Sequence, residues 1–278
     1  MAGANISQCT ITGNIKGTSF IGGISGIISD KSKIDESFND AIIGFINSND
    51  QTNVGYIGGI CGASSTESKI ENCYNAGEIN GYECWNAGIV GSSTRGTKIT
   101  NCYNIGKINS TLIKYKNSIN CIGGIAGNIY YDSNYKNVKC IIENCYNIGE
   151  IYTENATATT CEAGIVGYIS KGYANIINCY NSGNILNNIT DAGGIVGNIN
   201  NNPEIVIKNC KAIQKAIGRN QATSSNASIT ETNSNVTSME SILEVVNNGD
   251  NAYTNDIQHE DGTWKYNNGY PILKWQLQ

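Results

Sequence analysis

The chain has 278 residues and a formal charge of -5, and only 15% of its residues are charged. Its 18 lysine and arginine residues form no basic run, which argues against nucleic-acid binding, and its apolar runs are too short for a transmembrane helix. The 44 isoleucines far outnumber the 5 leucines, and the chain has 42 asparagines and 32 glycines. Isoleucine favours strands, while asparagine and glycine favour tight turns, so the composition indicates a β protein and excludes a helix bundle or coiled coil.

Two short motifs alternate from the N-terminus to about residue 218. The first, which we call the glycine motif, is a small residue followed by Gly-Ile-x-Gly and occupies residues 22–26, 58–62, 87–91, 123–127, 163–167 and 193–197. The second, the cysteine motif, is Ile-x-Asn-Cys-Tyr-Asn-x-Gly-x-Ile; full copies begin at Ile70, Ile99, Ile142 and Ile176, and degenerate copies at Ile6, Ile34 and Ile207. An internal repeat of this kind indicates a solenoid, a propeller or another array.

The spacing of the repeats favours a solenoid. The second glycine of the glycine motif recurs after 36, 29, 36, 40 and 30 residues, and the shortest repeats leave little room for the four antiparallel strands of a propeller blade. We therefore expect an all-β, right-handed parallel β-solenoid of about seven coils, in which equivalent residues stack as ladders. Extra residues around 111–120, 130–140 and 152–160 are expected to form loops.

Comparison of the copies predicts which side chains of the cysteine motif face the core. The cysteine position accepts only small side chains, which predicts an interior ladder of Cys73, Cys102, Cys145, Cys179 and Cys210. The second asparagine becomes Ile11 and Ala212 in the outermost copies, which predicts burial with amide-to-amide hydrogen bonds along Asn75, Asn104, Asn147 and Asn181. The aromatic position becomes Lys211 in the last copy, so the row of Tyr74, Tyr103, Tyr146 and Tyr180 is predicted to face water.

The tyrosine row is the candidate ligand-binding feature. Exposed aromatic faces and hydroxyls in a row suit a sugar chain or a protein strand. The alternative is structural, with the tyrosines supporting one another and covering a corner of the coil. No catalytic motif, phosphate loop or metal-ligand spacing is present, so no catalytic residue, metal site or cofactor is predicted, and the single histidine, His259, is interpreted as a solvated turn residue.

The eleven cysteines are expected to be mostly buried, reduced thiols. Parallel strands in register give poor geometry for a disulfide, although disulfides remain the alternative. Cys84, Cys121 and Cys161 precede the glycine motif by similar distances and predict a second, shorter stack.

The repeat stops near residue 218, so residues 1–218 are predicted to form the solenoid and residues 219–278 a capping segment. Within this segment, residues 221–234 are predicted to be a loop, residues 239–246 a short helix with capping residues at both ends, and residues 264–275 a hairpin. An open last coil would expose a sheet edge, so the segment is expected to close that end of the solenoid.

The alternation of the two motifs resembles the GLUG-motif repeat family, and the stretch from Asn268 to Trp275 resembles the ending often found after such repeats. The resemblance implies a non-catalytic stalk or adhesin module of a bacterial surface or secreted protein. It would present a flank or loops to a glycan or to a host or cell-surface protein, without nucleic-acid binding or membrane insertion. It also implies an extracellular or cell-surface location. Because Ile6 already lies in a repeat and no signal peptide precedes it, the chain is expected to be an excised fragment with further domains upstream.

The alternative function is that of a carbohydrate-active β-helix enzyme, a polysaccharide lyase or a glycoside hydrolase. Glycoside hydrolysis needs two carboxylates held across a cleft. Four glutamates recur at outward repeat positions, Glu71, Glu78, Glu143 and Glu150. Their recurrence indicates a solvated rim, so the sequence favours a non-catalytic module.

Overall fold

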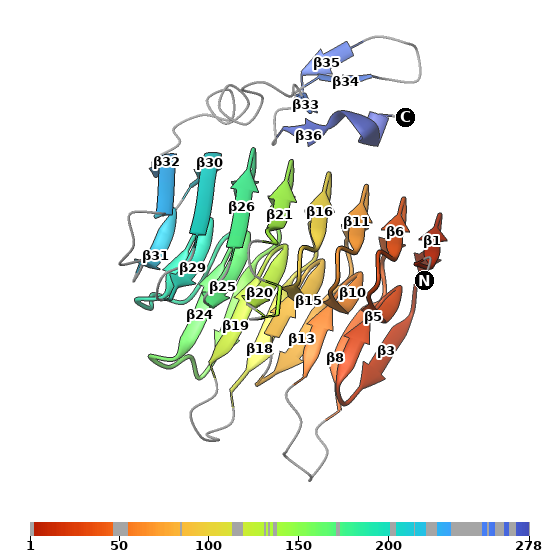
Figure 1. Ribbon diagram of the computed structural model, residues 1–278, viewed down its shortest axis with the longest axis horizontal. Helices are drawn as coiled ribbons and strands as arrows, with labels where there is room; N and C mark the ends of the chain where they lie inside the picture. The colour runs from red at the N-terminus through yellow and green to blue at the C-terminus, as the bar shows by residue number, and fades with distance from the viewer. Residues whose placement is uncertain are drawn as a thin grey trace.

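The computed structural model describes residues 3–46, 55–83, 85–112, 119–130, 132, 134–135, 138–170, 173–200, 204–213, 215–220, 227–234, 252–254, 256–258, 264–266 and 271–277. These residues form a stack of parallel coils whose short strands line up into long sheets (Figure 1). The described strands confirm the predicted parallel β-solenoid, and seven of them, one from each of seven coils, make up its sheet D. Within the described residues no helix is long and apolar enough to cross a membrane.

Sheet A is the largest, and most coils enter it twice. The first entries are β1 (Asn5–Ser7), β6 (Lys33–Asp35), β11 (Lys69–Glu71), β16 (Lys98–Thr100), β21 (Cys140–Glu143) and β26 (Tyr173–Ile177). The second entries are β2 (Thr10–Ile11), β7 (Phe38–Asn39), β12 (Tyr74–Asn75), β17 (Tyr103–Asn104), β22 (Tyr146–Asn147) and β27 (Tyr180–Asn181). The long strand β30 (Glu204–Ala212) pairs with both rows and joins them.

Three smaller parallel sheets complete the coils. Sheet B contains β3 (Asn14–Gly17), β8 (Ile42–Phe45), β13 (Ile79–Tyr82), β18 (Ile108–Thr111) and β23 (Ile151–Glu154). Sheet C contains β4 (Phe20–Gly22), β9 (Tyr56–Gly58), β14 (Trp85–Ala87), β19 (Asn120–Gly123), β24 (Thr160–Ala163) and β28 (Ala192–Gly193). Sheet D contains β5 (Ser25–Ile28), β10 (Cys61–Ser64), β15 (Val90–Thr94), β20 (Ala126–Tyr130), β25 (Val166–Ser170), β29 (Val196–Ile199) and β31 (Ile217–Asn220).

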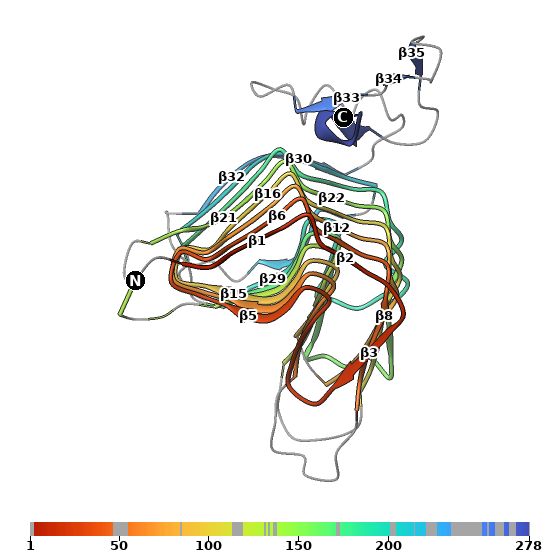
Figure 2. The same ribbon diagram turned by 90° about the vertical axis from the view of Figure 1, so that its right-hand side faces the viewer.

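The cross-section of the solenoid is bent into two arms, as the view along the stack shows (Figure 2). The first row of sheet A and sheet D enclose the upper arm, whose core is built from isoleucine, valine and cysteine side chains. Sheets B and C enclose the lower arm, whose core consists largely of isoleucines, among them Ile57, Ile79, Ile108 and Ile122. The same positions repeat in every coil, so the isoleucine excess follows from stacking one β-branched side chain on another.

The predicted asparagine ladder is confirmed and lies where the two arms meet. Asn39, Asn75, Asn104, Asn147 and Asn181 are fully buried, and each amide donates to the next along the stack at 2.6–2.8 Å. Each amide nitrogen also donates to the carbonyl oxygen two residues later in its own coil, as Asn75 does to Gly77 at 2.8 Å. The ladder therefore satisfies buried polar groups that would otherwise be costly.

This ladder explains the recurring glycines of both motifs. A Cβ atom on Gly59 would lie 2.1 Å from the carbonyl oxygen of Gly88 and 2.4 Å from the amide of Asn75. A Cβ on Gly106 would lie 2.1 Å from the carbonyl oxygen of Gly77. The backbone of both motifs thus packs directly on the amide ladder, and any larger residue would force the coils apart.

The solenoid continues beyond the predicted boundary at residue 218. Residues 227–234, predicted to be a loop, form β32 (Ala227–Ser234), which pairs in parallel with β30 and places Ile229 in register with Ile207. The prediction was wrong because the edge of β30 offers unpaired N–H and C=O groups, which a polar strand can satisfy without a large apolar face. The predicted helix over residues 239–246 lies outside the described residues.

The described part of the C-terminal segment runs beside the stack. Strands β33 (Tyr253–Thr254) and β36 (Ile272–Leu273) pair antiparallel, as do β34 (Asp256–Gln258) and β35 (Trp264–Tyr266), and the helix η1 (Lys274–Leu277) follows. The predicted hairpin is therefore wrong in its pairing, because residues 264–266 pair with an earlier strand. These elements lie along sheet A and not across the end of the solenoid (Figure 1).

Candidate functional site

The tyrosine row is buried, contrary to the prediction that it faces water. The rings of Tyr74, Tyr103, Tyr146 and Tyr180 stack at centroid distances of 4.9 Å. Tyr146 and Tyr180 have no exposed surface, and Tyr103 is 7% exposed; only Tyr74 is half-buried. Lys211, the residue that suggested exposure, is itself 7% exposed.

The C-terminal segment covers this row. Tyr253 and Leu273 pack in one cluster with the tyrosines, and Trp275 lies against Tyr103 at 5.8 Å between ring centroids. The Tyr253 hydroxyl donates to the carbonyl oxygen of Asn178 at 3.0 Å, and the Trp275 indole N–H donates to that of Asn101 at 2.9 Å. The row of stacked rings offers this segment a continuous apolar surface to bury, which stabilises its docking on the flank.

The cysteine ladder is buried and its thiols are free. Cys73, Cys102, Cys145, Cys179 and Cys210 have no exposed surface, and every described cysteine is unpaired. Each thiol donates to the carbonyl oxygen two residues earlier, at 3.0–3.2 Å. Burial raises the pKa of the Cys102 and Cys179 thiols well above the ordinary value, so these groups are poor nucleophiles and fit a packing role.

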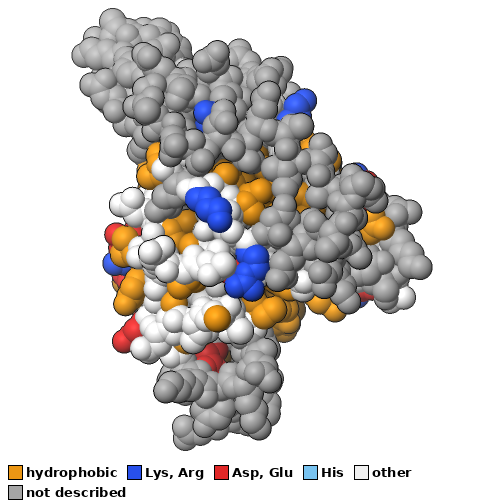
Figure 3. Space-filling view, turned by 90° about the vertical axis from the view of Figure 1, so that its left-hand side faces the viewer, with side chains coloured by type: hydrophobic (Ala, Val, Ile, Leu, Met, Phe, Trp, Pro, Cys, Tyr) orange, Lys and Arg blue, Asp and Glu red, His pale blue; other side chains and the backbone are white. Residues whose placement is uncertain are grey.

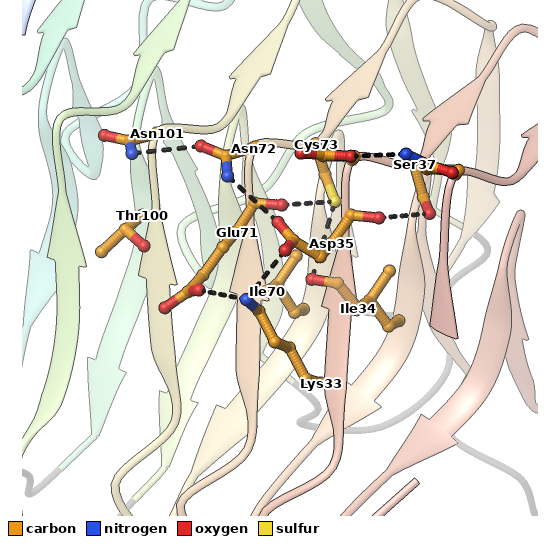
Figure 4. A network of polar contacts seen from close by, with 12 residues as sticks. Lys33, Ile34, Asp35, Ser37, Ile70, Glu71, Asn72, Cys73, Thr100 and Asn101 are labelled. Atoms are coloured by element: carbon orange, nitrogen blue, oxygen red, sulfur yellow. Dashed lines mark hydrogen bonds and ion pairs between the residues drawn. The ribbon is translucent and has the colours of Figure 1, made fainter. Parts of the chain in front are cut away.

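The outward glutamates are engaged with their neighbours. Figure 4 shows Lys33 between two carboxylates of sheet A, with its ammonium 2.8 Å from Asp35 and 2.8 Å from Glu71. Just before the strands of sheet B, Glu150 forms an ion pair with Lys107 at 2.9 Å. Half-exposed pairs of this kind belong to a solvated surface.

A groove that the sequence prediction does not include lies in the inner corner between sheets C and D, which we call the corner groove. Sheet C contributes Phe20, Tyr56 and Trp85, which occupy equivalent positions of successive coils. Sheet D contributes Ile27, Ala63, Ser92, Thr94 and Tyr130, and Ser64, Ser65 and Arg95 complete the lining of a cavity of about 530 Å³.

The three aromatic rings of sheet C form a continuous stripe in this groove. Phe20 and Tyr56 stack with ring centroids 4.5 Å apart and planes 10° apart, and Trp85 meets Tyr56 edge-on at 4.8 Å. Phe20 is 42% exposed, and across the groove Ile27 and Tyr130 are each 53% exposed. An apolar concave surface with a few hydroxyl groups has the composition of a ligand-binding site.

Arg95 is the charged member of the groove lining. Its guanidinium forms an ion pair with Asp132 at 2.6 Å and lies 5.0 Å from the centroid of the Tyr135 ring. The backbone N–H of Asn134 and the Arg95 guanidinium lower the pKa of the Asp132 carboxyl. This arrangement fixes the rim of the groove, because two partners hold the guanidinium in place.

Toward the C-terminal end, the corner is filled by side chains. Cys121, Cys161 and Tyr168 form a buried cluster against Trp85. Beyond them Asp191, 2% exposed, accepts a hydrogen bond from Asn198 at 2.7 Å and pairs with Arg219 at 2.6 Å. The open part of the groove is therefore confined to the first four coils.

Two details correct or extend the predicted ladders. Cys121 and Cys161 stack as predicted, but the preceding rung is Trp85; Cys84 lies outside the described residues. The aromatic stripe has a simple signal, because Phe20 and Tyr56 stand two residues before the small residue of a glycine motif, as Trp85 does. His259 also lies outside the described residues.

The last coil leaves apolar surface at the C-terminal end of the stack (Figure 3). A second cavity of about 380 Å³ at the end of the lower arm is lined by residues 185–190, 192–194 and 215. In the core of the same arm, Glu162 is fully buried, and neither carboxyl oxygen has a hydrogen-bond partner. Burial raises the pKa of this carboxyl to about 7.

Comparisons of the chain with protein-family models, with curated proteins and with solved structures found no match. Among the described residues, no three His, Cys, Asp or Glu side chains gather into a group that could hold a metal ion. Functional proposals therefore depend on the side chains of the corner groove and of the covered flank, which is the tyrosine row beneath the C-terminal segment.

Proposed function

We propose that this chain is a non-catalytic binding module and that the corner groove binds an extended sugar chain. The observation that carries the proposal is the partly exposed aromatic stripe of Phe20, Tyr56 and Trp85 in a concave surface. Sugar rings combine apolar C–H faces with hydroxyl groups, so they suit aromatic rings with serine and threonine hydroxyls beside them.

The composition of the groove favours binding over catalysis. Arg95 is the charged residue among those that line it, and glycoside hydrolysis requires two carboxylates facing the scissile bond. The acids of the enzyme alternative, such as Glu71 and Glu150, pair with lysines elsewhere on the solenoid and do not line the groove. A rigid stack that carries one elongated groove also suits a stalk that presents a binding surface.

The setting proposed for this module is the surface of a bacterial cell or its exterior. The support is the likeness of the alternating motifs to GLUG repeats, together with the low charge and turn-rich coils of the sequence. The tyrosine row is not part of the proposed site, because the C-terminal segment covers Tyr103, Tyr146 and Tyr180.

A glycan array probed with the wild-type protein and two variants tests the proposal. Trp85→Ala removes a ring from the stripe and is expected to weaken sugar binding at least about tenfold, since tryptophans often dominate binding energies. Tyr152→Ala removes an aromatic ring that is 39% exposed on sheet B, away from the groove, and is expected to leave binding unchanged. Absence of binding by the wild type, or equal binding by Trp85→Ala, would overturn the proposal.

A further inference from the structure

The aromatic row of sheet A ends in a ring that its own ladder leaves uncovered on one side. Phe38 occupies the ladder position of the tyrosines, and its ring stacks on Tyr74 with centroids 4.5 Å apart. In the first coil the same position holds Thr10, which pairs in register with Phe38. A threonine side chain is too short to cover a phenyl ring, so no ring of the ladder covers the face of Phe38 that points away from Tyr74.

A cavity of about 430 Å³, which we call the Phe38 cavity, lies at this end of the row, and its volume is typical of small-molecule sites. Phe38 and Trp275 both line it, with ring planes 4° apart and centroids 6.4 Å apart. The Trp275 indole N–H donates to the carbonyl oxygen of Asn101 at 2.9 Å, which holds the indole on the flank. Two half-buried aromatic rings therefore form the apolar part of the wall.

The rest of the lining is polar and carries one charge. Gln8, Thr10 and Asn72 are neutral, and Glu36 is the charged residue among the described residues that line the cavity. The Gln8 side-chain amide donates to Oε2 of Glu36 at 3.0 Å, which orients the carboxylate without neutralising it. The cavity thus combines two aromatic rings with a carboxylate that no lysine or arginine of the described lining offsets.

The surroundings of the Phe38 cavity are also negative. Burial and the nearby Asp40 carboxylate raise the pKa of Tyr74, the next ring of the row. Lys33, a cation of the same coil, is held between Asp35 and Glu71 at 2.8 Å from each. The chain as a whole carries a formal charge of -5. The field at this end of the row therefore favours a cation over an anion.

Aromatic faces attract cations, and a nearby carboxylate adds Coulombic attraction. A primary ammonium is compact and strongly hydrated, whereas a methylated ammonium presents apolar C–H groups that pack on aromatic rings. We propose that the Phe38 cavity binds a small organic cation with a methylated ammonium head. The head lies against Phe38 and Trp275, and Glu36 supplies the counter-charge. This site on sheet A is separate from the corner groove between sheets C and D and does not depend on sugar binding.

Calorimetric titration of the full chain with choline and two analogues tests the proposal. Dimethylbutanol, the uncharged carbon isostere of choline, keeps its shape, and ethanolamine keeps the charge without the methyl groups. We expect choline to bind at least about tenfold more tightly than dimethylbutanol, because the ring faces and the carboxylate both act on the charge. Equal affinity for dimethylbutanol, or no saturable binding of choline, would overturn the proposal, and equal affinity for ethanolamine would refute the methylated head.

Two variants assign the roles of the lining residues. Glu36→Gln removes the charge and Phe38→Leu removes the ring face while keeping apolar bulk, and each should weaken choline binding about threefold or more. The matched control is Glu67→Gln, since Glu67 lies outside the cavity in a turn with a φ of 58°, close to the 46° of Glu36. This control should keep the wild-type affinity.

Wild-type affinity in Glu36→Gln would refute the counter-charge, and this change of an exposed side chain remains a test if Phe38→Leu does not fold. As a second measurement, the indole N–H resonance of Trp275 in a nitrogen-15 spectrum should shift with choline and not with dimethylbutanol. An unchanged resonance at saturating choline would show that the cation binds elsewhere and would overturn the assignment of the site.

Discussion

The asparagine ladder predicts a large stability loss for a single substitution, Asn104→Ala. Asn104 accepts from Asn75 at 2.7 Å and donates to Asn147 at 2.7 Å and to the Gly106 carbonyl at 2.8 Å. Removal of its amide leaves three buried polar groups short of a partner. Since each such group is worth about 1–3 kcal/mol, we expect the free energy of unfolding to fall by at least about 3 kcal/mol.

Urea unfolding followed by circular dichroism measures this loss, with Asn80→Ala as the matched control. Asn80 is a half-buried asparagine on sheet B whose side-chain oxygen accepts a hydrogen bond from Asn109 at 3.3 Å, so the stability loss of Asn80→Ala should stay within about 0.5 kcal/mol. A fall of less than about 1 kcal/mol for Asn104→Ala would refute the view that the amide ladder stabilises the junction of the two arms. A lower m-value in the variant would show that coils on the two sides of residue 104 unfold separately.

Three further predictions concern buried side chains outside the asparagine ladder. The folded-state pKa of Glu162, about 7, lies above its unfolded value of 4.5, so the folded state binds the proton more tightly and the free energy of unfolding should fall by about 3 kcal/mol as pH rises through this range. Urea unfolding at pH 5 and pH 8 measures this fall, and the variant Glu162→Gln should show little of it. The nine buried cysteines should react with a thiol reagent only after denaturation, and thiol titers that stay low in denaturant would indicate disulfides instead. Trp275→Ala removes a ring contact and a hydrogen bond from the covered flank and should increase hydrogen exchange in β33 and β36; unchanged protection there would show that Trp275 does not anchor the segment.

Much of the solenoid could be predicted because its contacts repeat at the period of the sequence. The Ile, Cys and second Asn positions of the cysteine motif each meet their own equivalents one coil away, so a comparison of copies reveals burial directly. The same comparison failed for the aromatic position. Lys211 suggested exposure there, yet its side chain is buried, and Tyr180 is buried because residues from outside the repeat pack over the tyrosine row.

The corner groove shows the opposite case. Its rungs, Phe20, Tyr56 and Trp85, stand at a fixed place before the glycine motif, so their stacking is visible in the sequence. Their exposure is not, since it depends on the angle between the two arms and on Tyr168 filling the next level of the corner.

The sequence by itself determined the parallel coils, their number, the cysteine and asparagine ladders and the need for glycine beside the amides. These features depend on contacts between equivalent residues of adjacent coils, and stacking at about 4.8 Å makes the periodicity of the chain the periodicity of the structure. Only the tertiary structure decided which flank stays open, because the C-terminal segment has no repeat and docks where most apolar surface can be buried. The bend between the arms then left the aromatic stripe of the inner corner exposed and the tyrosine row covered.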